Sequence, residues 1–251
     1  MILGNTMAAT PHNISINQKP YVINDIIKAT PDVTVFRFKA EDNTTLNFDP
    51  GMFVMLTYVD KSNNEKITRA FSIASEPNGQ TVDFYIHMVH GKLTSKMESA
   101  AIGDRYFMTG PYGQFRFIPE EDKKVMFIAG GTGLAPFMSM LKKIEKESLS
   151  TDVVLLYSIR FPTEVIMGDE LKEIERKIHM KTIITVTRPE STDNWDGECG
   201  HINADMIKKY APDFMERTAY ICGPLNFVKA MKESLEALNV PNIKIKADVW
   251  G

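Results

Sequence analysis

A glycine-rich turn between a strand-like run and a helix-like run is the strongest chemical signal in the sequence. Residues 125–129 lead directly into Gly130-Gly131-Thr132-Gly133-Leu134-Ala135-Pro136, and an amphipathic segment follows. Glycines allow a tight turn and let a pyrophosphate approach the backbone, while the N–H groups at a helix start favour the anion. Pro136 stands in place of the third glycine of the usual dinucleotide fingerprint, so an ordinary strand–turn–helix connection is the alternative.

Two arginines follow neighbouring strand-like runs in the same half of the chain. Arg160 comes directly after the second run, where a site for NAD usually carries an acidic residue that holds the ribose hydroxyls. Arg188 comes directly after the third run. Forked, permanently charged guanidinium groups suit the 2′-phosphate of NADPH and therefore favour that dinucleotide. An equally good interpretation is that both arginines are solvated surface residues without a ligand.

The fourth strand-like run ends in Tyr220-Ile221-Cys222-Gly223-Pro224. Ligands of open α/β sheets bind beyond the carboxyl ends of the strands, so Cys222 is expected beside the glycine-rich turn. A buried structural cysteine is the alternative. Cys199 and His201 belong to metal-binding residue types, but nothing supplies further ligands at a suitable spacing, and no metal site is predicted.

The first half of the chain carries two further motifs. A strand-like run contains Arg69-Ala70-Phe71-Ser72, which combines a cation, an aromatic ring and a hydroxyl within four residues. Arg69 is suited to a phosphate, Phe71 to packing on a planar ring, and Ser72 to donating to a ring nitrogen; a plain strand with an exposed arginine is the alternative. Gly91-Lys92-Leu93-Thr94-Ser95 opens a helix-like segment and offers a second phosphate cradle.

The elements that must position these residues change character near Phe117. Between residues 21 and 117, apolar and polar residues alternate with period two, and turn residues separate the runs. One helix is expected at residues 93–101. The pattern favours an antiparallel six-stranded β-barrel. The predicted strands span residues 21–29, 33–39, 52–59, 66–74, 81–88 and 105–109.

Beyond a polar connector at residues 119–124, wholly apolar runs alternate with helical segments. This alternation predicts a doubly wound α/β domain with five parallel strands, covered by helices on both faces. We therefore expect a disordered tail at residues 1–19, a barrel domain at 20–118 and an α/β domain at 119–251. The five strands are expected at residues 125–129, 153–159, 182–187, 218–222 and 243–247, and the helices at 134–148, 163–179, 204–210 and 225–238.

Composition excludes several classes of protein. The chain has 251 residues, of which 43% are apolar and 24% charged, as in a soluble globular protein. A net charge of -3 gives no electrostatic case for binding nucleic acid. No apolar run reaches the roughly 18 residues that span a bilayer, and the first twenty residues lack a secretory signal. With only two cysteines, a cytoplasmic, thiol-reduced location is expected.

Taken together and in this order, the motifs resemble those of the ferredoxin–NADP⁺ reductase superfamily. The resemblance covers residues 21–251, and its flavin signatures match Arg69–Ser72 and Gly91–Ser95. The family's Gly-Pro-Tyr/Phe-Gly-x-Phe segment matches residues 110–115, its Gly-Gly-Thr-Gly-x-x-Pro segment matches 130–136, and its Cys-Gly-Pro segment matches 222–224. Residues 195–202 and 248–251 look like segments of the two-domain modules in oxygenase-type and flavohaemoglobin-type reductases. Asp248 stands where Glu is usual, and Trp250 where another aromatic is usual.

The resemblance implies FAD on the barrel and NADPH or NADH on the α/β domain. It implies a reductase that takes a hydride from NAD(P)H onto FAD and passes single electrons to a ferredoxin, a Rieske or other iron–sulfur protein, or a haem protein. A flavin subunit of a larger hydrogenase or monooxygenase complex and a non-catalytic redox-sensing module are the alternatives. The implied catalytic residues are Ser72, Cys222, Asp248 and Trp250, the last either covering the flavin or packing in the core. The implied cofactor-binding residues are Arg69, Ala70, Phe71, Ser72, His87, Val89, Gly91, Lys92, Leu93, Thr94, Ser95, Gly131, Thr132, Gly133, Pro136, Ser158, Arg160, Arg188, Cys222, Gly223, Pro224 and Trp250.

Overall fold

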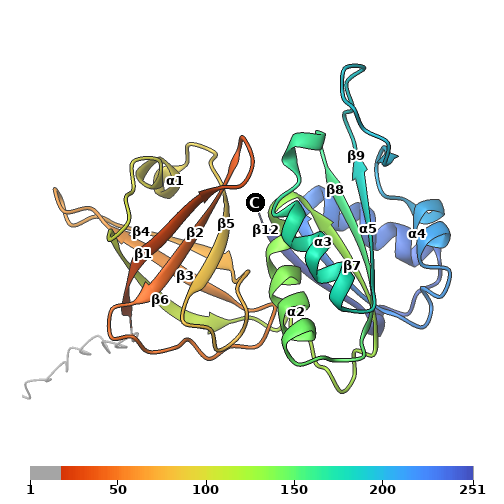
Figure 1. The fold of residues 1–251 in the computed structure, drawn as a ribbon, viewed down its shortest axis with the longest axis horizontal. Helices are drawn as coiled ribbons and strands as arrows, with labels where there is room; N and C mark the ends of the chain where they lie inside the picture. Colours follow the sequence, from red (N-terminus) through yellow and green to blue (C-terminus); the bar gives the residue numbers. More distant parts are fainter. Residues whose placement is uncertain (1–17, 251) are drawn as a thin grey trace, which may run out of the picture.

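The computed structural model describes residues 18–250. The tail predicted at residues 1–19 lies outside this range except for its last two residues, and the first strand begins at Lys19. Two units lie side by side, an antiparallel β-barrel and an α/β domain (Figure 1). The chain crosses from the first to the second between β6 and β7.

The first unit is a six-stranded antiparallel sheet with one short helix. Its strands lie in the order β4-β3-β6-β1-β2-β5. The two edge strands meet where the Ala74 N–H, just after β4, donates to the Asp83 carbonyl oxygen in β5 at 2.9 Å, so the sheet curves into a barrel. The elements are β1 (Lys19–Lys28), β2 (Val33–Ala40), β3 (Phe53–Val59), β4 (Lys66–Ser72), β5 (Val82–His87), α1 (Lys92–Met97) and β6 (Arg105–Tyr112).

Alternate side chains of the barrel strands fill its interior. The Phe38 ring packs on Phe84 and Tyr106, with ring centroids 5.7 and 5.4 Å away. The period-two pattern predicted that β5 would be half-buried, but Asp83 and Tyr85 on its outer face are buried as well. They are covered because the second unit packs against this face, which no local pattern encodes.

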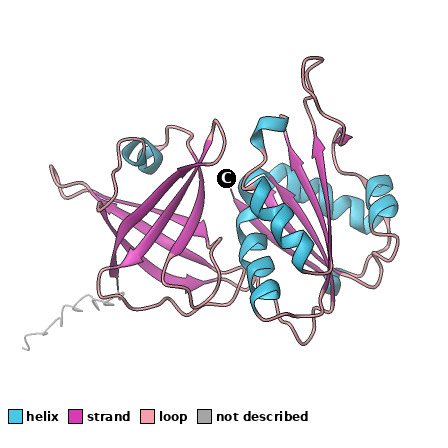
Figure 2. Ribbon diagram, in the orientation of Figure 1, coloured by secondary structure: helices cyan, strands magenta, loops and turns pink. Residues whose placement is uncertain are grey.

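The second unit is a parallel sheet with helices on both faces (Figure 2). Its strands lie in the order β10-β9-β8-β7-β11-β12, and every pairing among them is parallel. Short 3₁₀ turns occur at Gly131–Gly133, Pro162–Glu164 and Asn242–Lys244. The main elements are β7 (Lys124–Gly130), α2 (Leu134–Lys146), β8 (Asp152–Ile159), α3 (Gly168–Lys177), β9 (Met180–Val186), β10 (Glu198–Cys199), α4 (Ala204–Tyr210), β11 (Thr218–Pro224), α5 (Leu225–Ala237) and β12 (Ile245–Trp250).

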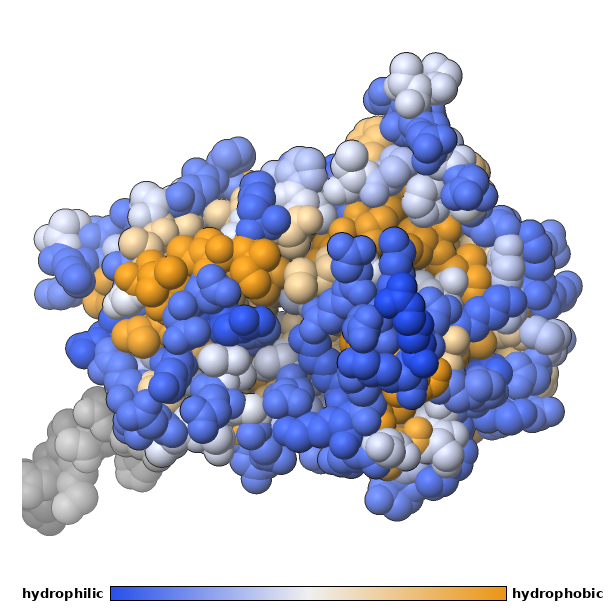
Figure 3. All heavy atoms as spheres, viewed as in Figure 1, coloured by the Kyte–Doolittle hydropathy of each residue, from blue (hydrophilic) through white to orange (hydrophobic). Residues whose placement is uncertain are grey.

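The central strand β7 shows why this sequence makes a doubly wound sheet. Phe127 packs with α2 and α3, whereas its neighbours Met126 and Ile128 pack with α4 and α5. A strand covered on both faces must be apolar where it is covered, as β7 is from residue 125 to residue 130. Hydrophilic residues cover the outer surfaces of α2 and α3 (Figure 3).

The predicted fold class is confirmed, with one correction to the number of parallel strands. The sheet has six strands and not five, because β10 adds two residues beside β9. A two-residue strand is too short to produce a hydrophobic pattern. Strand β12 also differs from the prediction at residues 243–247, since it runs from Ile245 to Trp250 through the polar Asp248. None of the helices within residues 18–250 is long and apolar enough to cross a membrane.

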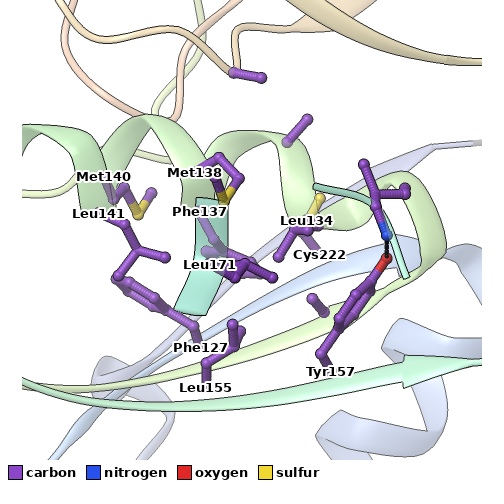
Figure 4. Close-up of a cluster of buried hydrophobic side chains, with 14 of the residues drawn as sticks. Phe127, Leu134, Phe137, Met138, Met140, Leu141, Leu155, Tyr157, Leu171 and Cys222 are labelled. Carbon is purple, nitrogen blue, oxygen red and sulfur yellow. Dashed lines mark hydrogen bonds between the residues drawn. The ribbon is translucent and has the colours of Figure 1, made fainter. Parts of the chain in front are cut away.

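A hydrophobic cluster joins the two units. Tyr85 and Ala74 of the barrel belong to the same buried cluster as Phe127 and Phe137 of the α/β domain. The rings of Phe127 and Phe137 stack with centroids 4.8 Å apart. In Figure 4, side chains of α2 point toward the strands that carry Phe127 and Leu155. The contact between the two units therefore has a buried apolar part.

A buried polar cluster ties the connector between the units to the last two long strands. The Asp122 side chain is 1% exposed and accepts hydrogen bonds from the Ile118 N–H, at 2.8 Å, and from the Tyr220 hydroxyl. Lys246 Nζ in β12 donates to the Tyr220 hydroxyl at 2.7 Å. Burial, and then the hydrogen bond to Asp122 and the charge of that carboxylate, raise the pKa of Tyr220, so its hydroxyl keeps its proton. We call Asp122, Tyr220 and Lys246 the connector cluster.

Candidate functional site

The glycine-rich turn lies at the carboxyl end of β7 and leads into α2. Gly131 has φ +54°, with open space where a Cβ would point. A Cβ on Gly133 would lie 2.2 Å from the carbonyl oxygen of Cys222, so only glycine lets this turn pack on the end of β11. The turn therefore leaves its backbone accessible at Gly131 while being held against the neighbouring strand at Gly133.

A cavity of about 660 Å³ opens beside this turn, between the α/β domain and the barrel. It lies at the carboxyl ends of the parallel strands, where open α/β sheets bind their ligands. The barrel contributes Asp32 and His87. Of the residues predicted to bind cofactors, the cavity brings together His87, Gly131, Thr132, Ser158, Arg160, Arg188, Pro224 and Trp250.

Arg160 does not stand free in this cavity. Its Nη2 lies 2.8 Å from the Asp32 carboxylate of the barrel. Its Nε donates to Glu164 at 3.2 Å, and its backbone N–H donates to the same carboxylate at 2.9 Å. The Arg188 N–H donates to the Arg160 carbonyl oxygen at 2.8 Å, and the Arg188 side chain is exposed, without a carboxylate partner among residues 18–250. Arg160 is therefore paired with carboxylates, whereas the Arg188 side chain is not paired with any within residues 18–250.

Cys222 and Asp248 lie on paired strands at the same edge of the sheet. They are register partners in β11 and β12. Cys222 is 1% exposed, and burial, followed by the charge of Asp248, raises the pKa of its thiol well above the ordinary value. Burial also raises the pKa of Asp248. Cys222 does not line the large cavity, while Asp248 lines a smaller one of about 380 Å³ between β12 and the barrel.

Trp250 ends β12 and forms part of the wall of the large cavity. Its ring packs against the hydrophobic cluster between the units. Its Nε1 is buried, with no hydrogen-bond partner among the described residues. Buried indole N–H groups usually find a partner, so this unsatisfied donor is an exception.

The barrel motif Arg69–Ser72 lies at the end of β4, outside the large cavity. Arg69 and Ala70 are exposed, whereas Phe71 and Ser72 are half-buried. The Arg69 guanidinium donates to the Thr68 carbonyl oxygen at 2.7 Å and has no carboxylate partner among residues 18–250. Ser72 is the register partner of Phe53, which lines the same smaller cavity as Asp248.

The second barrel motif begins α1, which lies beside β4. Thr94 Oγ1 accepts a hydrogen bond from the Gly91 N–H at 2.8 Å and fixes the start of the helix. Lys92 and Ser95 are exposed, while Leu93 packs inward. Val89 is 58% exposed, so it is available as an apolar contact. This arrangement places both barrel motifs on one side of the barrel (Figure 1).

The remaining predicted residues serve the packing around the glycine-rich turn. Pro136 is buried in the first turn of α2. A Cβ on Gly223 would lie 2.7 Å from the Phe227 ring, so this glycine lets α5 approach β11. Cys199, the second free thiol, is exposed in β10. Within residues 18–250, no three or more His, Cys, Asp or Glu side chains are grouped as metal ligands.

Sequence reasoning missed two acidic residues of the cavity, Asp32 and Glu164. Glu164 lies four residues after Arg160, but this segment is not an α-helix, so the spacing alone predicts no ion pair. Asp32 is separated from Arg160 by 128 positions, and no local sequence pattern predicts their contact. Asp32 stands in a turn signature, Thr30-Pro31-Asp32, which on its own indicates only a turn.

Comparison with protein-family models identifies both units. The model of the oxidoreductase FAD-binding domain matches residues 20–117, and that of the oxidoreductase NAD-binding domain matches residues 127–233. The matched segments correspond to the barrel and to most of the α/β domain. An FAD-binding and an NAD-binding domain are therefore present in this order.

The glycine betaine monooxygenase reductase subunit of Pseudomonas aeruginosa is one similar curated protein. It is 31% identical over 215 residues, which cover 84% of this chain and 58% of that protein. The chain thus spans less than two thirds of the length of this relative.

Solved structures share the two-domain arrangement. The cytochrome b5 reductase domain of Ulva prolifera nitrate reductase has a TM-score of 0.79 and 25% identity, covering 92% of this chain and 97% of that one. The FAD/NAD-binding domain of nitric oxide dioxygenase from Vibrio cholerae has a TM-score of 0.83 and 21% identity, covering 93% and 98%, which supports the fold. Two matched cofactor domains on this fold show that the chain belongs to the ferredoxin–NADP⁺ reductase superfamily of flavin-dependent oxidoreductases.

Proposed function

We propose that this chain takes a hydride from NADH or NADPH onto FAD and passes the electrons singly to an acceptor protein with an iron–sulfur or haem centre. The observation that carries the proposal is the cavity of about 660 Å³, which joins the glycine-rich turn to the barrel. Residues 20–118 would hold FAD, and residues 119–251 would hold the dinucleotide. FAD, when bound, supplies a hydride acceptor that can release electrons one at a time.

The barrel motifs fit the diphosphate and ring of FAD. The Arg69 guanidinium is exposed and, among residues 18–250, donates only to a carbonyl oxygen, so its charge is available to a phosphate. The start of α1 lies beside it and would contribute the N–H groups of Lys92, Leu93 and Thr94. Phe71 would pack on the flavin ring, and the Ser72 hydroxyl would donate to a ring nitrogen. Val89, with 58% of its surface exposed, would be covered by the cofactor.

The α/β domain fits a nicotinamide dinucleotide. The pyrophosphate would lie on the backbone of Gly131 and Thr132, at the start of α2. The open space beside Gly131 is a feature that a bound molecule would use. The residues present therefore suit both cofactors.

Cys222 and Asp248 would form the polar edge of the nicotinamide pocket. Because burial raises the pKa of the thiol, Cys222 stays protonated and presents a neutral, polarisable wall. The raised pKa of Asp248 means that its carboxyl group holds a proton more readily than an exposed aspartate does. Asp248 would hold this proton near Ser72, whose strand partner Phe53 lines the same small cavity.

We also propose the type of acceptor protein and the cellular location. The relative from Pseudomonas aeruginosa is named as the reductase subunit of a monooxygenase, which supports an acceptor protein of the oxygenase type. Such an acceptor would need to approach the barrel that would hold FAD. A cytoplasmic location is proposed because Cys199 and Cys222 are free thiols.

The experiment is an anaerobic titration of the FAD-loaded full chain with NADH and, separately, with NADPH. Loss of the oxidised flavin absorption at one equivalent of at least one dinucleotide is the expected result. Flavin that stays oxidised with both dinucleotides would contradict the proposal.

Arg69→Ala serves as the internal control of this titration. The variant should fold normally but retain less FAD after dialysis, because the diphosphate loses a charge-assisted hydrogen bond worth about 1.5–3 kcal/mol. The α/β domain should keep its affinity for dinucleotide. Undiminished FAD occupancy in this variant would remove Arg69 from the flavin site.

A further inference from the structure

One ion pair at the edge of the dinucleotide cavity comes from both units. Asp32 lies in the turn between β1 and β2 of the barrel, and its carboxylate is 2.8 Å from Arg160 Nη2. Arg160 follows β8 of the α/β domain, and the Nη2 that Asp32 contacts also contacts Glu164. Two carboxylates therefore compete for one guanidinium, and all three side chains line the cavity.

The position of Arg160 in the fold indicates which part of a dinucleotide this ion pair would contact. In dinucleotide-binding α/β domains, the residue after the second strand meets the adenosine ribose. β8 is the second strand of this unit, so Arg160 stands where a 2′-phosphate would be recognised. A phosphate binds a guanidinium through its paired N–H donors, and here Asp32 and Glu164 already engage Nε and Nη2. Arg188 is the only cation left in the cavity without a carboxylate partner among residues 18–250.

Resting on the proposed function, we infer that Asp32 of the flavin domain is a specificity-determining residue for the dinucleotide. By holding Arg160, and by placing its own charge at the ribose subsite, Asp32 weakens the binding of 2′-phosphorylated ligands relative to ligands with a free 2′-hydroxyl. The barrel thus takes part in selecting between NADPH and NADH. The hydroxyls of NADH need no free guanidinium and can donate to these carboxylates.

A second pair between the units separates this local effect from a general loosening of the domains. Glu76 of the barrel lies 3.2 Å from Lys146 of α2, and both line a different, charged crevice. Glu76→Gln removes an ion pair between the units, as Asp32→Asn does, but leaves the charge of the dinucleotide cavity unchanged. It is therefore the matched control.

The experiment compares binding of two probes, adenosine 2′,5′-bisphosphate and ADP, to the FAD-loaded full chain by calorimetry at low ionic strength. Asp32→Asn should tighten the bisphosphate about five- to tenfold, while ADP binding changes by less than about twofold. Glu76→Gln should leave both affinities unchanged. An unaltered ratio in Asp32→Asn, or an equal change in Glu76→Gln, would overturn the inference.

A second variant tests whether Asp32 acts on Arg160. In an Arg160→Gln background, Asp32→Asn should change the affinity ratio clearly less than in the parent chain, since only the direct repulsion between the Asp32 carboxylate and the phosphate remains. A full effect in that background would overturn the assigned role of Arg160. Both probes lack nicotinamide, so the result does not depend on hydride transfer. Failure of the flavin titration would reject the proposed function and leave this binding test standing.

Discussion

At the scale of single residues, Trp250 both packs in the hydrophobic cluster and lines the cavity. Its ring packs on the hydrophobic cluster between the units, and the same ring forms part of the cavity wall. Its Nε1 is buried without a partner among the described residues, which is costly when nothing is bound. A stacking ligand can therefore displace this side chain at a small cost in free energy.

Trp250→Ala is expected to tighten dinucleotide binding about two- to tenfold, because a stacked ring holds its place with about 0.5–1.5 kcal/mol. The measurement is the dissociation constant of NAD⁺ for the FAD-loaded chain. Trp250→Phe keeps a ring and removes the unpaired N–H, so its affinity should stay near that of the parent. A Trp250→Ala chain that melts far earlier, with unchanged affinity, would identify Trp250 as a core residue only.

At the scale of elements, the connector cluster fixes β12, the strand that carries Asp248 and Trp250. Tyr220 in β11 lies between the Asp122 carboxylate and Lys246. Because Lys246 is in β12, the cluster holds this edge strand against the connector between the units. The position of the proposed nicotinamide pocket therefore depends on a buried hydroxyl outside that pocket.

Tyr220→Phe should lower the free energy of unfolding by about 1–3 kcal/mol, since the buried Asp122 carboxyl group would lose a hydrogen-bond donor. Chemical denaturation monitored by circular dichroism measures this change. Tyr85→Phe is the matched control, because the Tyr85 hydroxyl is also buried at the domain contact but has no partner among the described residues. Equal destabilisation by both changes would show that Tyr220 contributes only packing.

Local patterns predicted most elements of the fold and failed at identifiable places. Strand β7 differs from the prediction at residues 125–129 by one residue at each end, since its apolar run coincides with the buried strand. Strand β10 was missed because two residues carry no periodicity. Residues 163–179 were predicted as one helix, but α3 begins only at Gly168, after Met167 adopts a left-handed conformation with φ 48°.

At the scale of the whole molecule, function depends on contacts between residues that are remote in sequence. The glycine-rich turn was recognisable because its function requires a local conformation. The pairing of Asp32 with Arg160 was not, because it arises only when the barrel packs against the α/β domain. Burial of Tyr85 and Asp83 on the outer face of β5 has the same origin.

The central claim is that the two cofactor domains meet so that a hydride passes directly between their cofactors. The most direct measurement uses NADH, or NADPH if the titration favours it, carrying deuterium at one or the other of its two C4 positions. The FAD-loaded chain is reduced anaerobically in a single turnover, and mass spectrometry then measures the deuterium content of the oxidised dinucleotide. A cavity with fixed walls presents only one face of the nicotinamide. The account therefore predicts complete loss of label from one isomer and complete retention in the other. Partial loss from both isomers, or no flavin reduction with either, would contradict it.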